Sequence, residues 1–591
     1  MMYYPSALCD IMNGYSQEEG MASIIKKVKK GRTYYYAAEC KRVNGKPRIV
    51  WQKYLGTVEG IVARAEGARP AKPKEVVVFE AGGVAALLGI AQRLGVMDLI
   101  NELVPKRDQG PTVGHYMLLA ALNRALAPCS KAEIGEWYES TILRRLWRLP
   151  KSAFSSQRFW DHMGMVSEEA IEAVQERLLE RVRSEFGIEP GLLLYDTTNF
   201  FTFLATTNHR AGLPQRGHSK AKRHDLRQVG LALMVTRKFM VPLLHRVYPG
   251  NVPDVSLFAQ LAHELIARYR QLAGDCSDAT LVFDKGNVSD DAMEALAVRG
   301  VRFVAALSAN RCKELLSAPC DRFEPLSGLA GTSAFSSITE IWGVRCRVVV
   351  AYTESFFTQQ LAGVTQNLIK CQKMLSDFQK GLDRWREGRC RGRRRTLASV
   401  RKKVQEILAP QFMKNLFRVR LDEQPISGKP DKKAPRLRYE VDHTAFTRLT
   451  NERLGRTLLV TNHLDWTSGQ VIEAYRGLTR VEESFKNMKN MTFLRWQPAY
   501  HWTDQKIRVH GFYCVLALLL STLARKQAVQ AGIELSLPAM LKQLSAIREV
   551  AVIYPKGTLA HPREHIAISR MSAKQRKLAQ ALNLATMLIA G

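Results

Sequence analysis

Hydrophobic and polar residues follow two different periods along the middle of this chain, and each period predicts a different kind of element. Short apolar runs bounded by turn residues predict buried β-strands, whereas apolar positions that recur every three or four residues predict helices. The helical pattern covers residues 255–272 and 290–299. The apolar runs are residues 192–195, 229–235, 241–247, 280–283 and 303–307. Three strands followed by a helix, a strand, a helix and a strand predict an α/β domain.

This order of elements is that of a ribonuclease-H-like α/β core. Its second and third strands should form an antiparallel hairpin around the turn Thr236-Arg237-Lys238. We expect the first strand to end at Asp196, because the polar residues Thr197, Thr198 and Asn199 follow it directly. The fourth strand should end in the same way at Asp284.

The flanking segments predict further regions around this core. Alternation on both sides of residues 43–46 predicts a β hairpin near the start, and helical spacing over residues 81–186 predicts a helical region. Short strands and a polar helical stretch near residues 359–386 predict a β-rich insertion, after which a helix over residues 468–490 returns to the core. The predicted regions are a small β module (1–75), a helical region (76–187), the two parts of the core (188–309 and 466–525), the insertion (310–465) and a helical C-terminal region (526–591).

The charge of the chain favours a polyanionic partner. The 591 residues include 87 Lys and Arg against 55 Asp and Glu, a net charge of +32, with the hydrophobic content of a folded protein. Such an excess allows many phosphate contacts and therefore favours nucleic acid. We expect no membrane partner, because neither terminus is a basic amphipathic segment and the apolar run 511–524 is too short to cross a bilayer.

The ten cysteines are scattered singly, a pattern that predicts neither disulfides nor a zinc site. The first twenty residues lack the charged and then apolar order of a signal peptide. Both observations favour a cytoplasmic protein.

The strongest basic run lies in the predicted insertion, where ten of the twenty residues from 384 to 403 are Arg or Lys. It includes the triplet Arg393, Arg394 and Arg395. Such a run is usually a solvated surface, but Glu387 is the one acidic residue within it and does not compensate ten basic residues, so phosphate contact is the alternative that we favour.

Two aspartates are the first candidates for chemistry. Asp196 and Asp284 each follow an apolar strand, and side chains at adjacent strand ends can converge on one metal ion. Because neighbouring carboxylates repel each other, a divalent cation such as Mg²⁺ or Mn²⁺ allows both to stay ionised. Taken singly, each aspartate could instead be an ordinary turn or helix-capping residue.

A third acidic candidate lies on the helix over residues 468–490. Seven residues are nearly two helical turns, so Tyr475, Glu482 and Lys489 should line one face beside an apolar stripe. Glu483 is rotated about 100° further from that stripe, which makes Glu482 the better metal ligand. The alternative is an ordinary amphipathic helix with Glu and Lys on its solvated side.

These residues carry a resemblance to bacterial insertion-sequence transposases of the DDE group, whose third acidic residue lies in a Tyr, Arg, Glu, Lys signature on a helix. Tyr475, Glu482 and Lys489 match the spacing of that signature. The Arg position is Leu478, so the neighbouring Arg480 is a substitute for the missing cation. Further segments that resemble the group are residues 195–199, 217–220, 225–229, 248–251, 284–286 and 497–502, with Arg508 and His510.

The resemblance implies a transposase that binds the ends of an insertion sequence, hydrolyses the phosphodiester there and transfers the 3′-hydroxyl ends to target DNA. It implies that Asp196, Asp284 and Glu482 are catalytic and hold two Mg²⁺ or Mn²⁺ ions. The implied partners are the terminal inverted repeats, the target DNA and a second copy of the chain in a homodimer on DNA. The expected DNA or phosphate contacts are Tyr475, Arg480, Lys489, Lys220, Arg393, Arg394 and Arg395.

Two alternatives keep the same fold. The chain could be a ribonuclease-H-like DNA nuclease that cuts without joining strands, or an inactive DNA-binding protein descended from a transposase. Retention of three acidic candidates argues against the second alternative. The location expected for the active enzyme is the bacterial cytoplasm, in association with the nucleoid.

Overall fold

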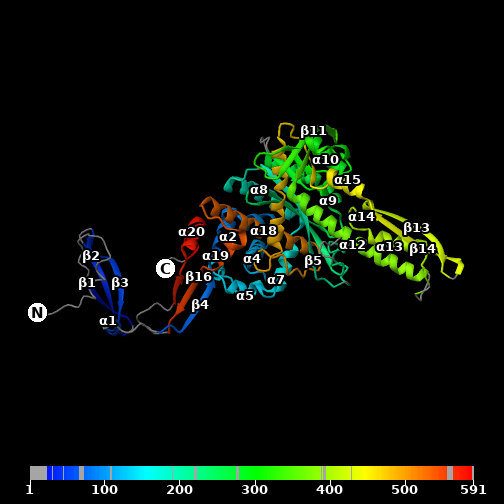
Figure 1. Ribbon diagram of the computed structural model, residues 1–591. Coiled ribbons are helices and arrows are strands. Elements are labelled where there is room, and N and C mark those ends of the chain that lie inside the picture. Colours follow the sequence, from blue (N-terminus) through cyan, green and yellow to red (C-terminus); the bar gives the residue numbers. More distant parts are fainter. Residues whose placement is uncertain are drawn as a thin grey trace. The chain divides into compact units, whose positions relative to one another are not determined.

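The computed structural model of the chain contains two compact units, one of residues 1–163 with 523–591 and one of residues 164–522 (Figure 1). The second unit contains all the predicted core strands. The structure describes residues 23–29, 31–43, 46–65, 72–106, 109–189, 191–205, 207–217, 223–273, 279–387, 389, 395–427, 429–555 and 564–588.

A mixed sheet of nine strands organises the second unit, in the order β10-β11-β12-β15-β9-β8-β5-β6-β7. Within it, β5 (Leu192–Thr202) is parallel to β8 (Thr280–Phe283), which in turn is parallel to β9 (Phe303–Ala306). On the other side of β5, β6 (Arg227–Thr236) and β7 (Pro242–Pro249) continue the sheet as antiparallel neighbours. The five strands predicted from the apolar runs are therefore confirmed, and so is the hairpin of the second and third.

The first of these strands is longer than predicted. The sequence predicts an end at Asp196, but β5 continues through Thr197, Thr198 and Asn199 to Thr202. This second half pairs with β6 alone, since β8 ends opposite Tyr195. Threonine is β-branched and favours an extended backbone, so a strand edge with one free side tolerates these polar residues.

The helices of the predicted core are also present. They are α9 (Asp254–Ala273) and α10 (Asp290–Val298), close to the predicted limits. The ring of Phe258 on α9 lies 5.2 Å from that of Tyr195 and 4.7 Å from that of Phe283, measured between centroids. Thus α9 covers one face of β5 and β8.

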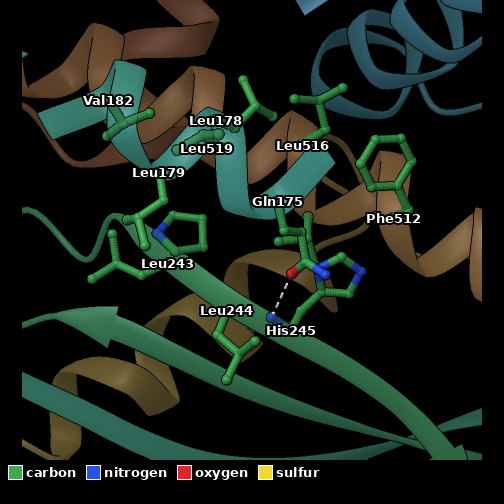
Figure 2. Close-up of a pocket in the computed structure, with 12 residues that line it drawn as sticks. Gln175, Leu178, Leu179, Val182, Leu243, Leu244, His245, Phe512, Leu516 and Leu519 are labelled. Atoms are coloured by element: carbon green, nitrogen blue, oxygen red, sulfur yellow. Dashed lines mark hydrogen bonds between the residues drawn. The ribbon is translucent and has the colours of Figure 1, made fainter. Parts of the chain in front are cut away.

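A buried histidine lies where α8 (Glu168–Phe186), β7 and α18 (Asp504–Gln530) meet (Figure 2). His245 is 5% exposed, and its backbone N–H donates to Gln175 Oε1 at 2.9 Å. Leucine and valine side chains surround it, and the cavity left among them measures only about 40 Å³. Burial, with a smaller effect of the charge on Arg246, lowers the pKa of His245 to about 3.

The helix α18 contains the apolar run of residues 511–524. It is long and apolar enough to cross a membrane by length and composition, but 94% of its apolar window is buried. This agrees with the prediction of a buried core helix.

Within the described part of the segment predicted as a β-rich insertion, only the hairpin of β13 (Phe417–Ile426) and β14 (Lys429–Val441) forms a sheet of its own. The strands β11 (Thr332–Ile341), β12 (Val344–Thr353) and β15 (Arg456–Thr461) extend the central sheet from β9, with the short β10 (Glu324–Pro325) at the edge. The reason is that β15 pairs with β9 through Leu459, Val460 and Thr461 and so continues the core sheet. The interpretation of the segment as a β-rich insertion domain stays a prediction.

The rest of this segment is largely helical. The long helix α12 (Glu354–Arg386) packs with α13 (Leu397–Ile407) and with the hairpin of β13 (Phe417–Ile426) and β14 (Lys429–Val441) around a cluster of buried apolar residues (Figure 1). Leu375, Val400 and Leu437 are central members of that cluster. The shorter helices of the segment are α11 (Lys313–Leu316), α14 (Met413–Leu416) and α15 (His443–Glu452).

After the insertion, the predicted single helix is two helices, α16 (Ser468–Arg476) and α17 (Thr479–Met488). Between them the backbone N–H groups of Leu478, Arg480 and Val481 bond to carbonyls three residues earlier, as in a 3₁₀ turn. Gly477 lies in this turn, where a Cβ atom would meet the Ala474 carbonyl oxygen at 2.9 Å and Leu194 at 3.4 Å. The turn therefore lies against β5.

The first unit begins with the predicted hairpin. Strands β2 (Arg32–Val43) and β3 (Lys46–Gly56) are antiparallel, β1 (Ser23–Lys29) pairs with β2, and α1 (Val58–Ala65) follows. The predicted helical region is confirmed. Its helices are α2 (Gly82–Arg93), α3 (Val96–Leu103), α4 (Val113–Leu126), α5 (Ile134–Glu139), α6 (Leu143–Trp147) and α7 (Ser156–Met165).

The C-terminal region is not entirely helical, which corrects the prediction. Besides α19 (Leu537–Ser545) and α20 (Ala573–Ala581), it contains β16 (Arg548–Ile553) and β17 (Glu564–Ile568). These two strands form a sheet with β4 (Glu75–Glu80) in the order β17-β16-β4. The partner of β16 comes from the opposite end of the chain, so local sequence pattern did not reveal the pairing.

Candidate active site

The structure brings two of the predicted acidic residues together at one point of the central sheet. Tyr195 of β5 and Phe283 of β8 are register partners in a parallel pair of strands. Asp196 directly follows Tyr195, and Asp284 directly follows Phe283. Neighbouring strands lie about 4.8 Å apart, so the two aspartates start from adjacent backbone positions. Both are half-buried. The prediction that the two aspartates lie on adjacent strands is confirmed, and the convergence of their carboxylates on a metal ion stays a prediction.

Tyr475 connects the last turn of α16 to this pair. Its hydroxyl group donates a hydrogen bond of 2.6 Å to Asp284 Oδ1. Burial raises the pKa of Tyr475 well above its ordinary value, and the hydrogen bond to Asp284 and the negative charges of Asp284 and Asp196 raise it further. The phenol therefore stays protonated and holds one oxygen of Asp284 in place.

Lys489, at the end of α17, contacts β5 two residues beyond Asp196. Its ammonium group donates to Thr198 Oγ1 at 2.7 Å and lies 5.2 Å from the ring centroid of Phe200. Side chains two residues apart share one face of a strand, so Asp196, Thr198 and Phe200 lie on the same face of β5. The predicted cation therefore lies beside the acidic pair.

Glu482 lies in the first turn of α17, between the two points at which this segment touches β5. Glu482 is exposed, whereas the neighbouring Glu483 is half-buried. In the part of the chain that the structure describes, no group of three or more Asp, Glu, His or Cys side chains is arranged to hold a metal ion. The choice of Glu482 as the third ligand therefore stays a prediction.

Arg480, the predicted substitute for the missing signature arginine, contacts the turn after β6. Arg480 Nη1 donates to the backbone oxygen of Arg237 at 3.3 Å, in the turn after β6. The backbone N–H of Arg237 bonds to Leu192 at the start of β5, at the opposite end of the strand from Thr198. Arg480 and Lys489 thus lie at different ends of β5.

The remaining predicted DNA contacts are outside this site. Lys220, Arg393 and Arg394 lie outside the described residues. Arg395 is exposed, and its guanidinium group lies 5.2 Å from the ring centroid of Phe378 on α12. Its role in phosphate binding stays a prediction.

A cavity of about 580 Å³ lies along the second half of β5, which begins after Asp196, and the sequence patterns did not reveal it. The second half of β5, the loop after β7, the end of α17 and the segment after it line this cavity. Trp496 and Asn199 are lining residues that were not predicted to have a role. Trp496 directly precedes the segment 497–502, whose resemblance to the transposase group was the available signal for this part of the cavity.

Comparison with known proteins relates the chain to a protein family and to solved structures. Residues 201–519, more than half of the chain, match a family described as "Transposase DDE domain". Asp284 and Glu482 lie inside the matched range, and Asp196 lies five residues before it. No curated protein matches the chain. A cryo-EM structure of the piggyBac transposase synaptic complex with hairpin DNA is similar over 85% of each chain, at 10% identity and a TM-score of 0.37.

Proposed function

The chain belongs to the transposase DDE domain family, and on this premise we propose that it binds the ends of a mobile DNA element, cleaves them and joins the 3′-hydroxyl ends to target DNA. The single observation that carries the proposal is the adjacent placement of Asp196 and Asp284 under the hydroxyl of Tyr475. The net charge of +32 supports DNA as the partner. A homodimer on DNA remains a prediction.

The core that carries the site is, in this proposal, ribonuclease-H-like. The strand order β9-β8-β5-β6-β7, with β5, β8 and β9 parallel and β6 and β7 antiparallel, supports this assignment. The strands β10, β11, β12 and β15 would then be an addition to one edge of the core.

We infer that Asp196, Asp284 and Glu482 hold two divalent cations, Mg²⁺ or Mn²⁺. Oxygen donors of this kind suit these hard ions, and a divalent cation offsets the repulsion between two half-buried carboxylates on adjacent strands. Glu482 is exposed in the first turn of α17, so the proposal requires a change of its side-chain torsions toward the two aspartates. When bound, a pair of such ions activates the attacking oxygen and stabilises the leaving oxygen of the phosphodiester.

The chain's own residues prepare the site for this reaction. Tyr475 orients Asp284 through its hydrogen bond, which is the kind of outer contact that fixes a ligand for its metal. Lys489, beside Thr198, supplies a positive charge next to the acidic pair, where it would offset the negative charge that develops on the phosphate.

The test of this function is a strand-transfer assay with the full-length protein. The substrate is a duplex that carries the element end found beside the reading frame, and the target is a supercoiled plasmid. The wild-type protein should cleave the end with Mg²⁺ and yield joined products, and Asp284→Ala should do neither while still binding the end. Cleavage without joined products from a pre-cut end would instead favour the nuclease, and full cleavage by Asp284→Ala would refute the assignment.

The matched pair Glu482→Gln and Glu483→Gln tests the third carboxylate. The two residues are neighbours on α17, and each substitution removes a charge without changing the side-chain volume. We expect Glu482→Gln to abolish cleavage and Glu483→Gln to retain it. The opposite result would identify Glu483 as the metal ligand.

A further inference from the structure

A group of buried polar rings links α18 to the segment that follows α17, and the proposed reaction does not use it directly. His510 of α18 is 0% exposed, and its Nε2 lies 2.7 Å from the backbone oxygen of Trp496. A carbonyl oxygen can only accept a hydrogen bond, so this nitrogen of His510 carries a proton and is the donor. The segment before α18 is therefore bound to that helix through an imidazole N–H.

Two neighbours fix the orientation of the His510 ring. When Nε2 is protonated, the neutral ring has Nδ1 as its acceptor. Tyr513 Oη lies 2.6 Å from Nδ1 and His501 Nε2 lies 2.8 Å from it, and either atom can donate to it. His501 and Tyr513 are buried as well, with exposed fractions of 5% and 0%. The imidazole of His510 is thus held at both nitrogens inside the core.

Trp496 transmits this constraint from His510 to Lys489 by two routes. The first is its backbone, whose N–H donates to the Met488 oxygen at 2.9 Å, directly before Lys489. The second is its indole ring, which is 1% exposed and stacks on Phe200 at a centroid distance of 4.4 Å and an interplanar angle of 10°. The ammonium group of Lys489 lies over the same Phe200 ring, at 5.2 Å from its centroid. Both routes lead to the cation beside the acidic pair.

Lys489 depends on such support for its position. A lysine is a compact charge on a flexible stem, so the groups that it contacts decide where the charge lies. Lys489 is exposed, and its contacts with the Thr198 hydroxyl and the Phe200 ring direct its ammonium group to β5. A shift of Trp496 would move Phe200 and, with it, the surface on which the ammonium group of Lys489 lies.

We propose that His510 is a positioning residue for the reaction, which acts through Trp496 and Phe200 to hold the ammonium group of Lys489 beside Asp196. The inference rests on the proposed function, because it needs Lys489 to act on the phosphate. His510 is buried and does not contact the substrate itself. Its effect on the reaction should therefore disappear when the Lys489 charge is removed, whereas a general contribution to stability would remain.

The test is a double-mutant cycle on single-turnover cleavage of an element-end duplex by the full-length protein. His510→Leu removes the N–H donor, whereas His510→Gln keeps an amide donor at a similar distance from the backbone. We expect His510→Leu to slow cleavage by about two- to tenfold, the loss expected for one neutral hydrogen bond, and His510→Gln to slow it less. In the Lys489→Met background, His510→Leu should cause no further slowing.

Phe200→Leu tests the same connection at a second point, in case His510→Leu does not fold. It removes the ring between Trp496 and Lys489 but leaves the hydrogen bond from His510 to Trp496 in place. Like His510→Leu, it should slow cleavage by the wild-type protein and have no further effect on Lys489→Met. Melting temperatures show which variants are folded.

His245→Leu is the matched control, because His245 is another buried histidine of the same unit and has leucine side chains around it. This variant should leave the cleavage rate unchanged. Equal slowing by His510→Leu and Phe200→Leu with and without the Lys489 charge would overturn the inference and make the buried rings a structural element only. Unchanged cleavage in both variants would overturn it as well. Either outcome is distinct from failure of the proposed function, in which the wild-type protein itself does not cleave the duplex.

Discussion

Replacing Tyr475 by Phe removes one hydroxyl group and leaves the ring that packs in the last turn of α16. The lost hydrogen bond joins this hydroxyl to Asp284 Oδ1 at 2.6 Å, and it stabilises the ionised carboxylate. A hydrogen bond to a charged group contributes about 1.5–3 kcal/mol, or about 10- to 150-fold in an equilibrium constant. Loss of an outer contact to a metal ligand typically weakens metal binding by about 10- to 100-fold.

We therefore expect the Mg²⁺ concentration that gives half-maximal cleavage to rise by about tenfold or more in Tyr475→Phe. The assay is a Mg²⁺ titration of single-turnover cleavage of an element-end duplex. Tyr439→Phe is the control, because the Tyr439 hydroxyl bonds to the Gln372 oxygen at 3.3 Å, away from the site. An unchanged Mg²⁺ midpoint and cleavage rate in Tyr475→Phe would refute the role given to this tyrosine.

Three other predictions concern charge. Lys489→Met should slow cleavage by about tenfold or more, whereas Lys486→Met, at an exposed position of the same helix, should not; equal rates would contradict the role of Lys489. Because the pKa of His245 falls from 6.5 to about 3 on folding, the folded state binds this proton less well, and the free energy of unfolding should decrease below pH 6.5 by up to about 1.4 kcal/mol per pH unit. Denaturant melts at pH 7 and pH 5 measure the loss of unfolding free energy in the wild-type protein and in His245→Gln. The loss should be smaller in His245→Gln, and an equal loss in both proteins would contradict the role of His245. The logarithm of DNA affinity should fall linearly with the logarithm of salt concentration, with a slope of about −0.9 per phosphate contact, and a flat line would contradict phosphate binding.

The sequence was sufficient to predict the core strands, because β6 to β9 and the first half of β5 are largely buried and their apolar runs stand out from the polar segments around them. It was also sufficient to predict that Asp196 and Asp284 lie on neighbouring strands, since Asp196 follows the apolar run of β5, Asp284 follows β8, and the two strands prove to be parallel neighbours. Tyr475 and Lys489 were found by their spacing on a helix, and each touches the predicted part of the sheet.

Other features depend on pairings that a local pattern does not contain. The end of β5 was misplaced because Thr197, Thr198 and Asn199 are typical turn residues, and only the partner strand β6 keeps them extended. The sheet of β4, β16 and β17 joins both ends of the chain. The cavity along the second half of β5 is formed by segments that are separate in sequence, so it becomes visible only in three dimensions.

The central claim is that three carboxylates share a pair of divalent cations in the folded core. The most direct test is a crystal structure of the full-length protein with Mn²⁺ and an element-end duplex, in which anomalous scattering locates the ions. We predict two peaks about 3.5–4 Å apart between Asp196 and Asp284, with the carboxylate of Glu482 bound to one of them. Peaks ligated by Glu483 in its place, or a Glu482 carboxylate that remains in solvent while both ions are bound, would contradict the account.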